Sequence, residues 1–144
     1  MNHECYSFPL AAEMLIRRSE HPKCSLPRSV EQHLHLLITT AFGELPTDRR
    51  FGCCIWDYDF DNLTSSHKVK EYIRQSLLEA ILQYEKRLIT PRIELVLGQV
   101  DPRDTSGSCR MKKIIHIYIA GYLQYTNDPF EYRDSFFTGP LSYQ

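Results

Sequence analysis

The feature that most constrains the fold is one amphipathic pattern between residues 67 and 88. Apolar side chains recur there every three or four residues, which places them on one side of an α-helix. They are Val69, Tyr72, Ile73, Leu77, Ala80, Ile81, Tyr84 and Leu88. The residue before a proline is pushed out of the helical region, so Thr90-Pro91 predicts the end of this helix. A single long helix with one apolar face needs a second layer to cover that face.

A second helix is predicted to begin at Ser29. The segment Ser29 to Gln32 fits a capping box, in which side chains bond the exposed N–H groups of the first turn. Apolar residues then follow at helical spacing, and Gly43 is a plausible stop. Residues 1–28 are interrupted by three prolines and are interpreted as a leader, with one short helix between Leu10 and Arg18.

The remaining segments favour extended structure. Aromatic and β-branched residues such as Phe51 and Phe60 favour extended structure or loop between Glu44 and Asp61, and predict strands over Ile93–Val100 and Phe130–Thr138. The segment Lys112–Tyr125 is apolar on both faces, so its strand is either central in the sheet or covered on both sides. The predicted class is α+β, with two main helices packed on a small, mostly antiparallel sheet of about three to four strands.

Length and charge limit the possible functions. A chain of 144 residues suits one domain, predicted over residues 29–144. Lys and Arg total 17 against 18 acidic residues, which gives no basic footprint for nucleic acid. We find no apolar run near the roughly 18 residues of a membrane span and no signal sequence, so a cytoplasmic protein without membrane insertion is expected. The five cysteines are expected to be reduced thiols.

Candidate chemical sites do not fit their templates. The acidic residues at 57, 59 and 61 resemble the start of a calcium loop, but Asn62 and Lys68 occupy positions that need Gly and Glu. His33 and His35 are too close in sequence to share a helix face, and His116 is expected to be a partly buried neutral imidazole. Four carboxyls are nominal candidates for glycosidase chemistry: Glu44, Asp48, Asp57 and Glu85. We predict no catalytic residue, cofactor or metal.

One arrangement resembles a known family. A capped helix is followed by Gly43-Glu44, then by Phe51-Gly52, the long helix and Pro91-Arg92-Ile93. This order and spacing are similar to the small baseplate wedge family of contractile injection machines. That family includes the type VI secretion subunit TssE and phage-tail relatives once labelled lysozyme-like. Family members usually carry Glu-Pro-Arg at the end of the long helix, where this chain has Thr90-Pro91-Arg92. Glu85 is one candidate for the acidic partner, and the alternative is that this chain has none.

The resemblance implies a structural role in a type VI secretion baseplate. The expected partners are other wedge subunits and sheath proteins, with the chain serving as a platform for sheath assembly. Under this hypothesis Arg92, Glu85, Phe51 and Gly52 are partner-binding residues, and the sheet edge receives sheath strands. The alternative implied by the older label is a peptidoglycan-cleaving, lysozyme-like hydrolase.

Overall fold

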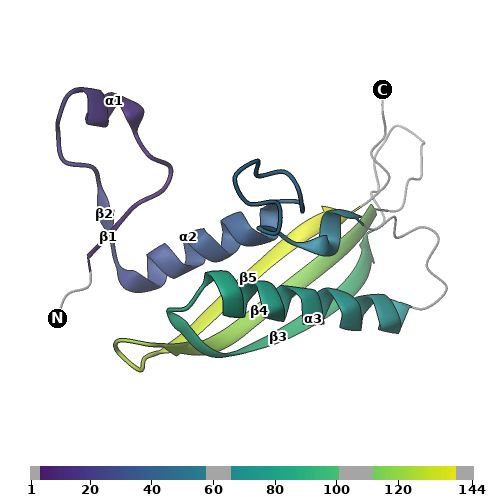
Figure 1. Ribbon diagram of the computed structural model, residues 1–144. Coiled ribbons are helices and arrows are strands. Elements are labelled where there is room, and N and C mark those ends of the chain that lie inside the picture. Colours follow the sequence, from purple (N-terminus) through teal and green to yellow (C-terminus); the bar gives the residue numbers. More distant parts are fainter. Residues whose placement is uncertain (1–3, 58–65, 101–111, 139–144) are drawn as a thin grey trace.

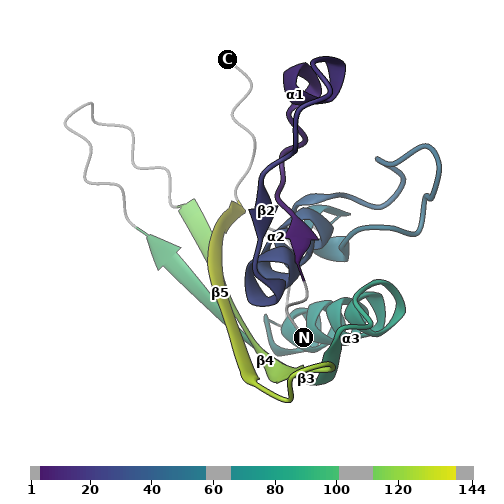
Figure 2. The ribbon, with the colours of Figure 1, turned by 90° about the vertical axis from the view of Figure 1, so that its left-hand side faces the viewer.

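A three-stranded antiparallel sheet with two helices on one face forms the body of the protein (Figures 1 and 2). The computed structural model describes residues 4–57, 66–100 and 112–138. The sheet order is β3 (Leu88–Val100), β4 (Lys112–Leu123) and β5 (Pro129–Thr138). The helices are α2 (Leu26–Thr39) and α3 (Ser66–Tyr84). The predicted α+β class, with two main helices on a small antiparallel sheet, is confirmed.

Strand β4 is the central strand, which explains its two apolar faces. It pairs with β3 through Ile93↔Ile119 and with β5 through Ile119↔Tyr132. Side chains alternate between the two faces of a strand, so odd-numbered residues of β4 point to the helices. The buried residues on this inner face are Ile93, Leu95, Ile115, Ile117, Ile119, Leu123, Phe130 and Tyr132. The even-numbered side chains of β4 lie on the outer face of the sheet. No layer of described residues covers that face.

The long helix α3 is shorter than predicted. It ends at Tyr84, and β3 begins at Leu88, so the predicted helix end at Thr90-Pro91 is wrong. The cause is tertiary, because Glu85 is buried in an ion pair that fixes the chain as it leaves the helix. Strand β3 accommodates Pro91 through a register shift between Ile89 and Arg92. Thr90 has a left-handed φ of 49° at this irregularity.

Helix α2 begins before the predicted capping box. Its N-cap is Ser25, with an extended backbone and no side-chain cap bond, and Pro27 lies in the first turn. Proline is tolerated there because the first N–H groups of a helix have no partner inside it. Ser29 is therefore inside the helix and buried, and the predicted cap is wrong. The helix also ends earlier than expected, at Thr39 rather than near Gly43.

The segment after α2 folds back against the helix end. A parallel bridge joins Ala41 to Cys53, and the Cys53 N–H donates to the Thr40 carbonyl at 2.8 Å. Residues Cys54–Asp57 form the 3-10 helix η1, so the extended structure or loop predicted between Glu44 and Asp61 is wrong in that part. The part of that prediction over residues 58–61 lies outside the described part of the chain, as does most of the calcium-like motif.

The leader is an ordered arm that extends from the N-terminus of α2 (Figure 1). It consists of the paired strands β1 (Cys5–Tyr6) and β2 (Lys23–Cys24), with helix α1 (Ala12–Ile16) between them. The short helix predicted over Leu10–Arg18 is thus present in its central part. None of the α1 residues is buried. Whether the domain boundary lies at residue 28 stays a prediction.

Candidate partner-binding surfaces

A buried ion cluster joins the end of α3 to the middle of α2. The Glu85 side chain is only 1% exposed, and its Oε2 lies 2.8 Å from Nη2 of Arg87 and 2.7 Å from Nδ1 of His33. Arg87 also donates from Nε to Oε1 of Glu85 at 2.8 Å, which makes the pair bidentate. Its Nη1 donates to the Ser29 hydroxyl at 2.9 Å. The cluster thereby cross-links two helices at one point.

The cluster keeps Glu85 ionised. Burial alone raises the pKa of this carboxyl, but the hydrogen bonds from His33 and Arg87 and the charge of Arg87 outweigh that effect. The net result is a pKa of about 2 for Glu85. The acidic partner sought for Arg92 is therefore paired with Arg87 instead. Glu85-Lys86-Arg87, directly after the end of α3, has the Glu-x-Arg spacing of the triplet that the resemblance implies, with Lys86 in place of proline. The Glu-x-Arg spacing was the sequence signal that could have revealed this.

Of the four predicted partner-binding residues, Glu85, Phe51 and Gly52 are buried, and only Arg92 is exposed. Phe51 is buried, stacks on His33 with ring centres 6.1 Å apart and meets Tyr84 edge-on at 5.0 Å. Gly52 is buried at a φ of 137°, where an added Cβ would lie 2.6 Å from the Thr40 carbonyl oxygen. Only glycine fits such a position. Phe51 thus joins the Glu85 cluster through His33, and Gly52 lies against the backbone after α2, whereas Arg92 is exposed on β3.

A second polar cluster, which sequence reasoning missed, joins α2 to β5. His35 Nδ1 lies 3.0 Å from Asp134 Oδ2, and the Tyr132 hydroxyl donates to the same oxygen at 2.7 Å. Burial opposes ionisation of Asp134, but the bonds from Tyr132, the Ser135 N–H and His35 lower its pKa overall. The pairing spans about a hundred residues of chain, so no local pattern pointed to it. It fixes the position of α2 along the last strand.

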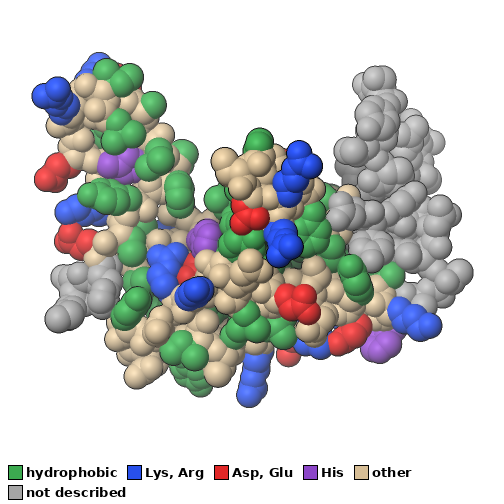
Figure 3. Space-filling model, in the orientation of Figure 1, with side chains coloured by type: hydrophobic (Ala, Val, Ile, Leu, Met, Phe, Trp, Pro, Cys, Tyr) green, Lys and Arg blue, Asp and Glu red, His purple; other side chains and the backbone are tan. Residues whose placement is uncertain are grey.

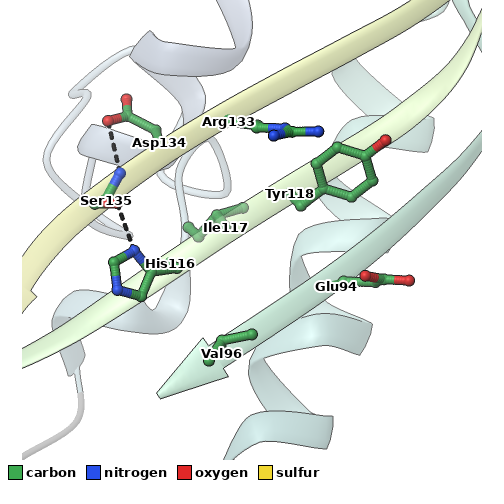
Figure 4. Close-up of a pocket in the computed structure, with 8 residues that line it drawn as sticks. All are labelled: Glu94, Val96, His116, Ile117, Tyr118, Arg133, Asp134 and Ser135. Atoms are coloured by element: carbon green, nitrogen blue, oxygen red, sulfur yellow. Dashed lines mark hydrogen bonds between the residues drawn. The ribbon is translucent and has the colours of Figure 1, made fainter. Parts of the chain in front are cut away.

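The outer face of the sheet carries a hollow of about 780 Å³ (Figure 4). Val96, Tyr118 and Arg133 come from three adjacent strands, and the Arg133 guanidinium carbon lies 5.0 Å from the centre of the Tyr118 ring. His116 is exposed here, so its predicted partial burial is wrong. Its Nδ1 lies 2.7 Å from the Ser135 hydroxyl. The hollow thus brings apolar, aromatic and charged groups together on the exposed face of the sheet.

Three of the four nominal glycosidase candidates, Glu44, Asp48 and Glu85, have described side chains, and none of them has the properties of the general acid. A glycosidase needs a general acid whose pKa is raised. The pKa of Asp48 is instead lowered, first by the hydrogen bond from the Tyr84 hydroxyl and second by that from the Arg50 N–H. The pKa of Glu85 is also lowered, so this buried carboxyl is an anion. Glu44 is exposed and accepts a bond from the Ala41 N–H at 2.8 Å. The side chain of Asp57, the fourth nominal candidate, lies outside the described part.

The described residues contain neither a metal-binding cluster nor a helix able to span a membrane. Residues 4–57, 66–100 and 112–138 hold no group of three or more His, Cys, Asp or Glu side chains placed to bind a metal ion. Within the same ranges, no helix has the length and apolar character needed to cross a bilayer. On the face shown in Figure 3, acidic and basic side chains are interspersed, and apolar side chains are exposed on the projecting leader.

Comparison with known families decides the assignment. The family described as Baseplate wedge protein gp25 matches residues 24–128 of this chain. The chain belongs to the baseplate wedge protein gp25 family. The matched residues include helices α2 and α3, the bridge between Ala41 and Cys53, and strands β3 and β4. It leaves out the leader up to residue 23 and strand β5. The resemblance inferred from residue order is thereby confirmed.

A solved structure supports the same fold. A protein described as a tail lysozyme from Geobacter sulfurreducens superposes with a TM-score of 0.54 and 22% sequence identity. The alignment covers 83% of this chain and 96% of that one. At this identity the likeness shows the fold alone. A comparison with curated proteins found no match.

Proposed function

We propose that this wedge-family chain is a structural, non-enzymatic subunit of a bacterial type VI secretion baseplate. In the cytoplasm it links the other wedge subunits to the sheath and is the platform on which sheath assembly begins. The observation that carries the proposal is the family match over residues 24–128. Two features support it: the outer sheet face has an exposed, partly aromatic surface, and the sheet has two edges for strand addition.

Arg92 is proposed to contact a wedge partner directly. It is exposed on β3, and among the described residues it takes part in no ion pair. An arginine in that state offers two parallel N–H groups to a partner's carboxylate. The Phe51-Gly52 region contacts partners through the loop that it anchors, which exposes Phe42 and Leu45. Glu85 acts indirectly, by fixing the chain around Arg87.

Co-expression with the neighbouring wedge and sheath subunits tests this role. Wild-type chain is expected to co-purify with them, and Arg92→Ala is expected to lose most of this capture while its thermal stability stays unchanged. Lys86→Ala, at another exposed cation, is the matched control and should be captured like wild type. If none of the subunits is captured by the wild-type chain, the proposed function is wrong. If the wild-type chain is captured and Arg92→Ala is captured equally well, the role of Arg92 is wrong and the proposed function stands.

The lysozyme alternative receives no support from the described carboxyls, and the name of the Geobacter protein applies to that protein. A cell-wall turbidity assay with purified chain separates the two functions. We expect no clearing above buffer. Clearing that is abolished by one Glu→Gln substitution would overturn the non-enzymatic assignment.

A further inference from the structure

Two cysteines face each other at the base of the leader arm. Strand β1 pairs with β2 in an antiparallel register that places Cys5 directly opposite Cys24 (Figure 1). Residues in such a pair have their side chains on the same face of the ribbon. Both cysteines are thiols and are half-buried. Cys5 lies outside the residues matched by the family, 24–128, so membership of the family does not account for the pair.

The backbone spacing of this pair suits a disulfide. The Ser7 N–H donates to the Pro22 carbonyl at 2.9 Å, and these two residues lie opposite each other two positions further along the ribbon. Hydrogen-bonded and non-bonded pairs alternate along antiparallel strands, so Cys5 and Cys24 are a bonded pair, whose Cα atoms are about 5.5 Å apart. Disulfides join Cα atoms that are about 4.4–6.8 Å apart. The two strands therefore already have a separation that a disulfide can span.

A bridge at this position is expected to be easily reduced. Opposite Cβ atoms on antiparallel strands are about 4.5–5.5 Å apart, whereas those of a relaxed disulfide are about 3.8 Å apart. The two Cβ atoms must approach each other, and the resulting strain makes the bond more reducible. Strained or exposed disulfides are the labile, regulatory ones, and in reducing compartments disulfides are usually transient. The pair thus has the properties of a reversible bridge.

Each sulfur lies beside a polar group of the helical layer. Arg87 Nη1 lies 4.0 Å from Cys5 Sγ, and Cys24 Sγ lies 4.0 Å from Gln32 Oε1. Sulfur is a weak donor and a weak acceptor, so exchanging these two contacts for a covalent bond costs little. Stronger bonds hold the arm on α2, because Gln32 accepts from the Phe8 N–H at 3.1 Å and donates to the Phe8 carbonyl at 3.2 Å. The arm therefore stays in place when the two sulfurs approach each other.

The surroundings favour Cys5 as the sulfur that reacts first. Arg87 binds Glu85 through Nε and Nη2, whereas its Nη1 faces Cys5 and donates to the Ser29 hydroxyl at 2.9 Å. Reactive cysteines have electropositive, partly exposed surroundings, and redox-sensing ones often have a second cysteine beside them. The polar neighbour of Cys24 is an uncharged amide. Cys5 thus combines a cation, partial exposure and a partner thiol.

We propose that Cys5 and Cys24 form a reversible disulfide in response to hydrogen peroxide. The Cys5 thiolate attacks one peroxide oxygen, so that an S–O bond forms, the O–O bond breaks, and hydroxide leaves as water with the proton that the thiol released. The Cys24 sulfur then attacks the resulting sulfenic acid: the S–S bond forms, the S–O bond breaks, and a second water carries away the Cys24 proton. Two thiols are thereby oxidised by two electrons, and the peroxide is reduced to two water molecules. Two molecules of a thiol such as glutathione reverse the reaction by exchange and are themselves oxidised to their disulfide.

The bridge fixes the base of the leader arm. It closes the loop of residues 6–23, which contains α1, and joins β1 to β2 covalently. Each of these strands is two residues long, and an isolated two-stranded ribbon is marginally stable at best. The Ser7 amide, whose bond to Pro22 closes the ribbon, is therefore expected to exchange its hydrogen at least about tenfold more slowly after oxidation. The proposal does not depend on the baseplate role.

Peptide mapping of the full chain tests the proposal. Reduced protein is treated with hydrogen peroxide at pH 7, the remaining thiols are blocked with N-ethylmaleimide in urea, and the chain is cut with trypsin. Cleavage after Arg17, Lys23 and Arg28 places the two cysteines in separate peptides, residues 1–17 and 24–28. The linked pair of peptides is expected from more than half of the chains. It should disappear when the oxidised protein is treated with glutathione before cleavage.

Serine variants provide the controls. Cys5→Ser and Cys24→Ser should each abolish the linked pair, whereas Cys109→Ser should keep it. Cys53 and Cys54 are buried and should be recovered with the maleimide block. After peroxide, dimedone should label the Cys5 sulfenic acid in Cys24→Ser at least about fivefold more than Cys24 in Cys5→Ser, and equal labelling would refute the assigned order of the two steps.

Three outcomes would overturn the disulfide. They are the absence of the linked pair in wild type, linkage of Cys5 to another cysteine as often as to Cys24, and linkage between separate chains, seen as a dimer in non-reducing electrophoresis. Because the wild-type chain itself is mapped, a serine variant that failed to fold would leave this test intact. Exchange at the Ser7 amide that is unchanged by oxidation would refute the expected effect on the arm.

Discussion

Replacing Glu85 with glutamine is expected to cost a large part of the stability of this domain. The substitution keeps the shape of the side chain but removes its charge from a site that is 1% exposed. Arg87 then keeps a guanidinium that is about a quarter exposed and has lost its bidentate carboxylate. His33 loses its 2.7 Å contact as well. The variant therefore leaves two polar groups without their partner at the junction of α2 and α3.

Two independent estimates of the cost agree. A pKa of about 2 for Glu85, against 4.5 for an unperturbed glutamate, corresponds to about 3 kcal/mol of stability at neutral pH. Breaking a buried ion pair by removing one partner typically costs about 3–5 kcal/mol, and the partial exposure of Arg87 favours the lower end. With a urea m-value of about 2 kcal/mol/M, the unfolding midpoint should fall by about 1.5 M.

Urea unfolding of wild type and Glu85→Gln at several pH values measures this effect. The pKa of Glu85 is lower in the folded state than in the unfolded state, so its contribution is complete above the unfolded value of 4.5. It is lost as the pH falls from about 4.5 toward 2. The difference between the two proteins should therefore be about 3 kcal/mol at pH 7 and should shrink below pH 4.5. Glu94→Gln, at an exposed position on β3, is the control and should change stability by less than about 0.5 kcal/mol.

A difference below 1 kcal/mol at pH 7 would refute the reasoning, because the ion cluster would then contribute no more than a surface pair. A full-sized difference that stays constant down to pH 3.5 would refute it in another way. That result would mean that the glutamine disturbs packing and that the charge of Glu85 is not responsible.

Two further predictions concern the segment that packs on the helix end. Gly52→Ala should destabilise the protein by about 3 kcal/mol or more in thermal unfolding, because of its left-handed φ and its contact with a carbonyl oxygen. Gly43→Ala, at a φ of 81° but with open space around it, should cost only about 1–2 kcal/mol, and equal losses would contradict the steric explanation. Two effects raise the pKa of the Cys53 thiol: the larger is its hydrogen bond with the Cys54 thiol, and the smaller is its burial. Iodoacetamide at pH 8 should therefore leave Cys53 unmodified in the native chain and modify it in urea. Peptide mass spectrometry measures the modification. Rapid labelling of Cys53 in the native chain would contradict its burial.

The local periodicities of the sequence predicted most elements of the fold. The stripe from Val69 to Ile81 forms the buried face of α3, except for Tyr72, which is exposed. The two-sided apolar run of residues 112–123 lies at the centre of the sheet. Both follow from rules that act between residues a few positions apart. The order of Gly43, Phe51-Gly52 and the long helix was also sufficient to identify the family, since it depends on spacing along the chain.

Only the tertiary structure determined where the elements end and which groups meet. Helix α3 stops at Tyr84, where Glu85 binds His33 of α2 and Arg87, and Arg87 in turn binds Ser29 of α2. The periodicity of the helix does not contain these contacts with a distant segment. The pairing of His35 with Asp134 likewise joins segments about a hundred residues apart. The sequence by itself thus determined the helices, the strands and the family. Packing between distant residues decided the ion cluster and the exposed sheet face, because burial and charge pairing depend on the whole fold.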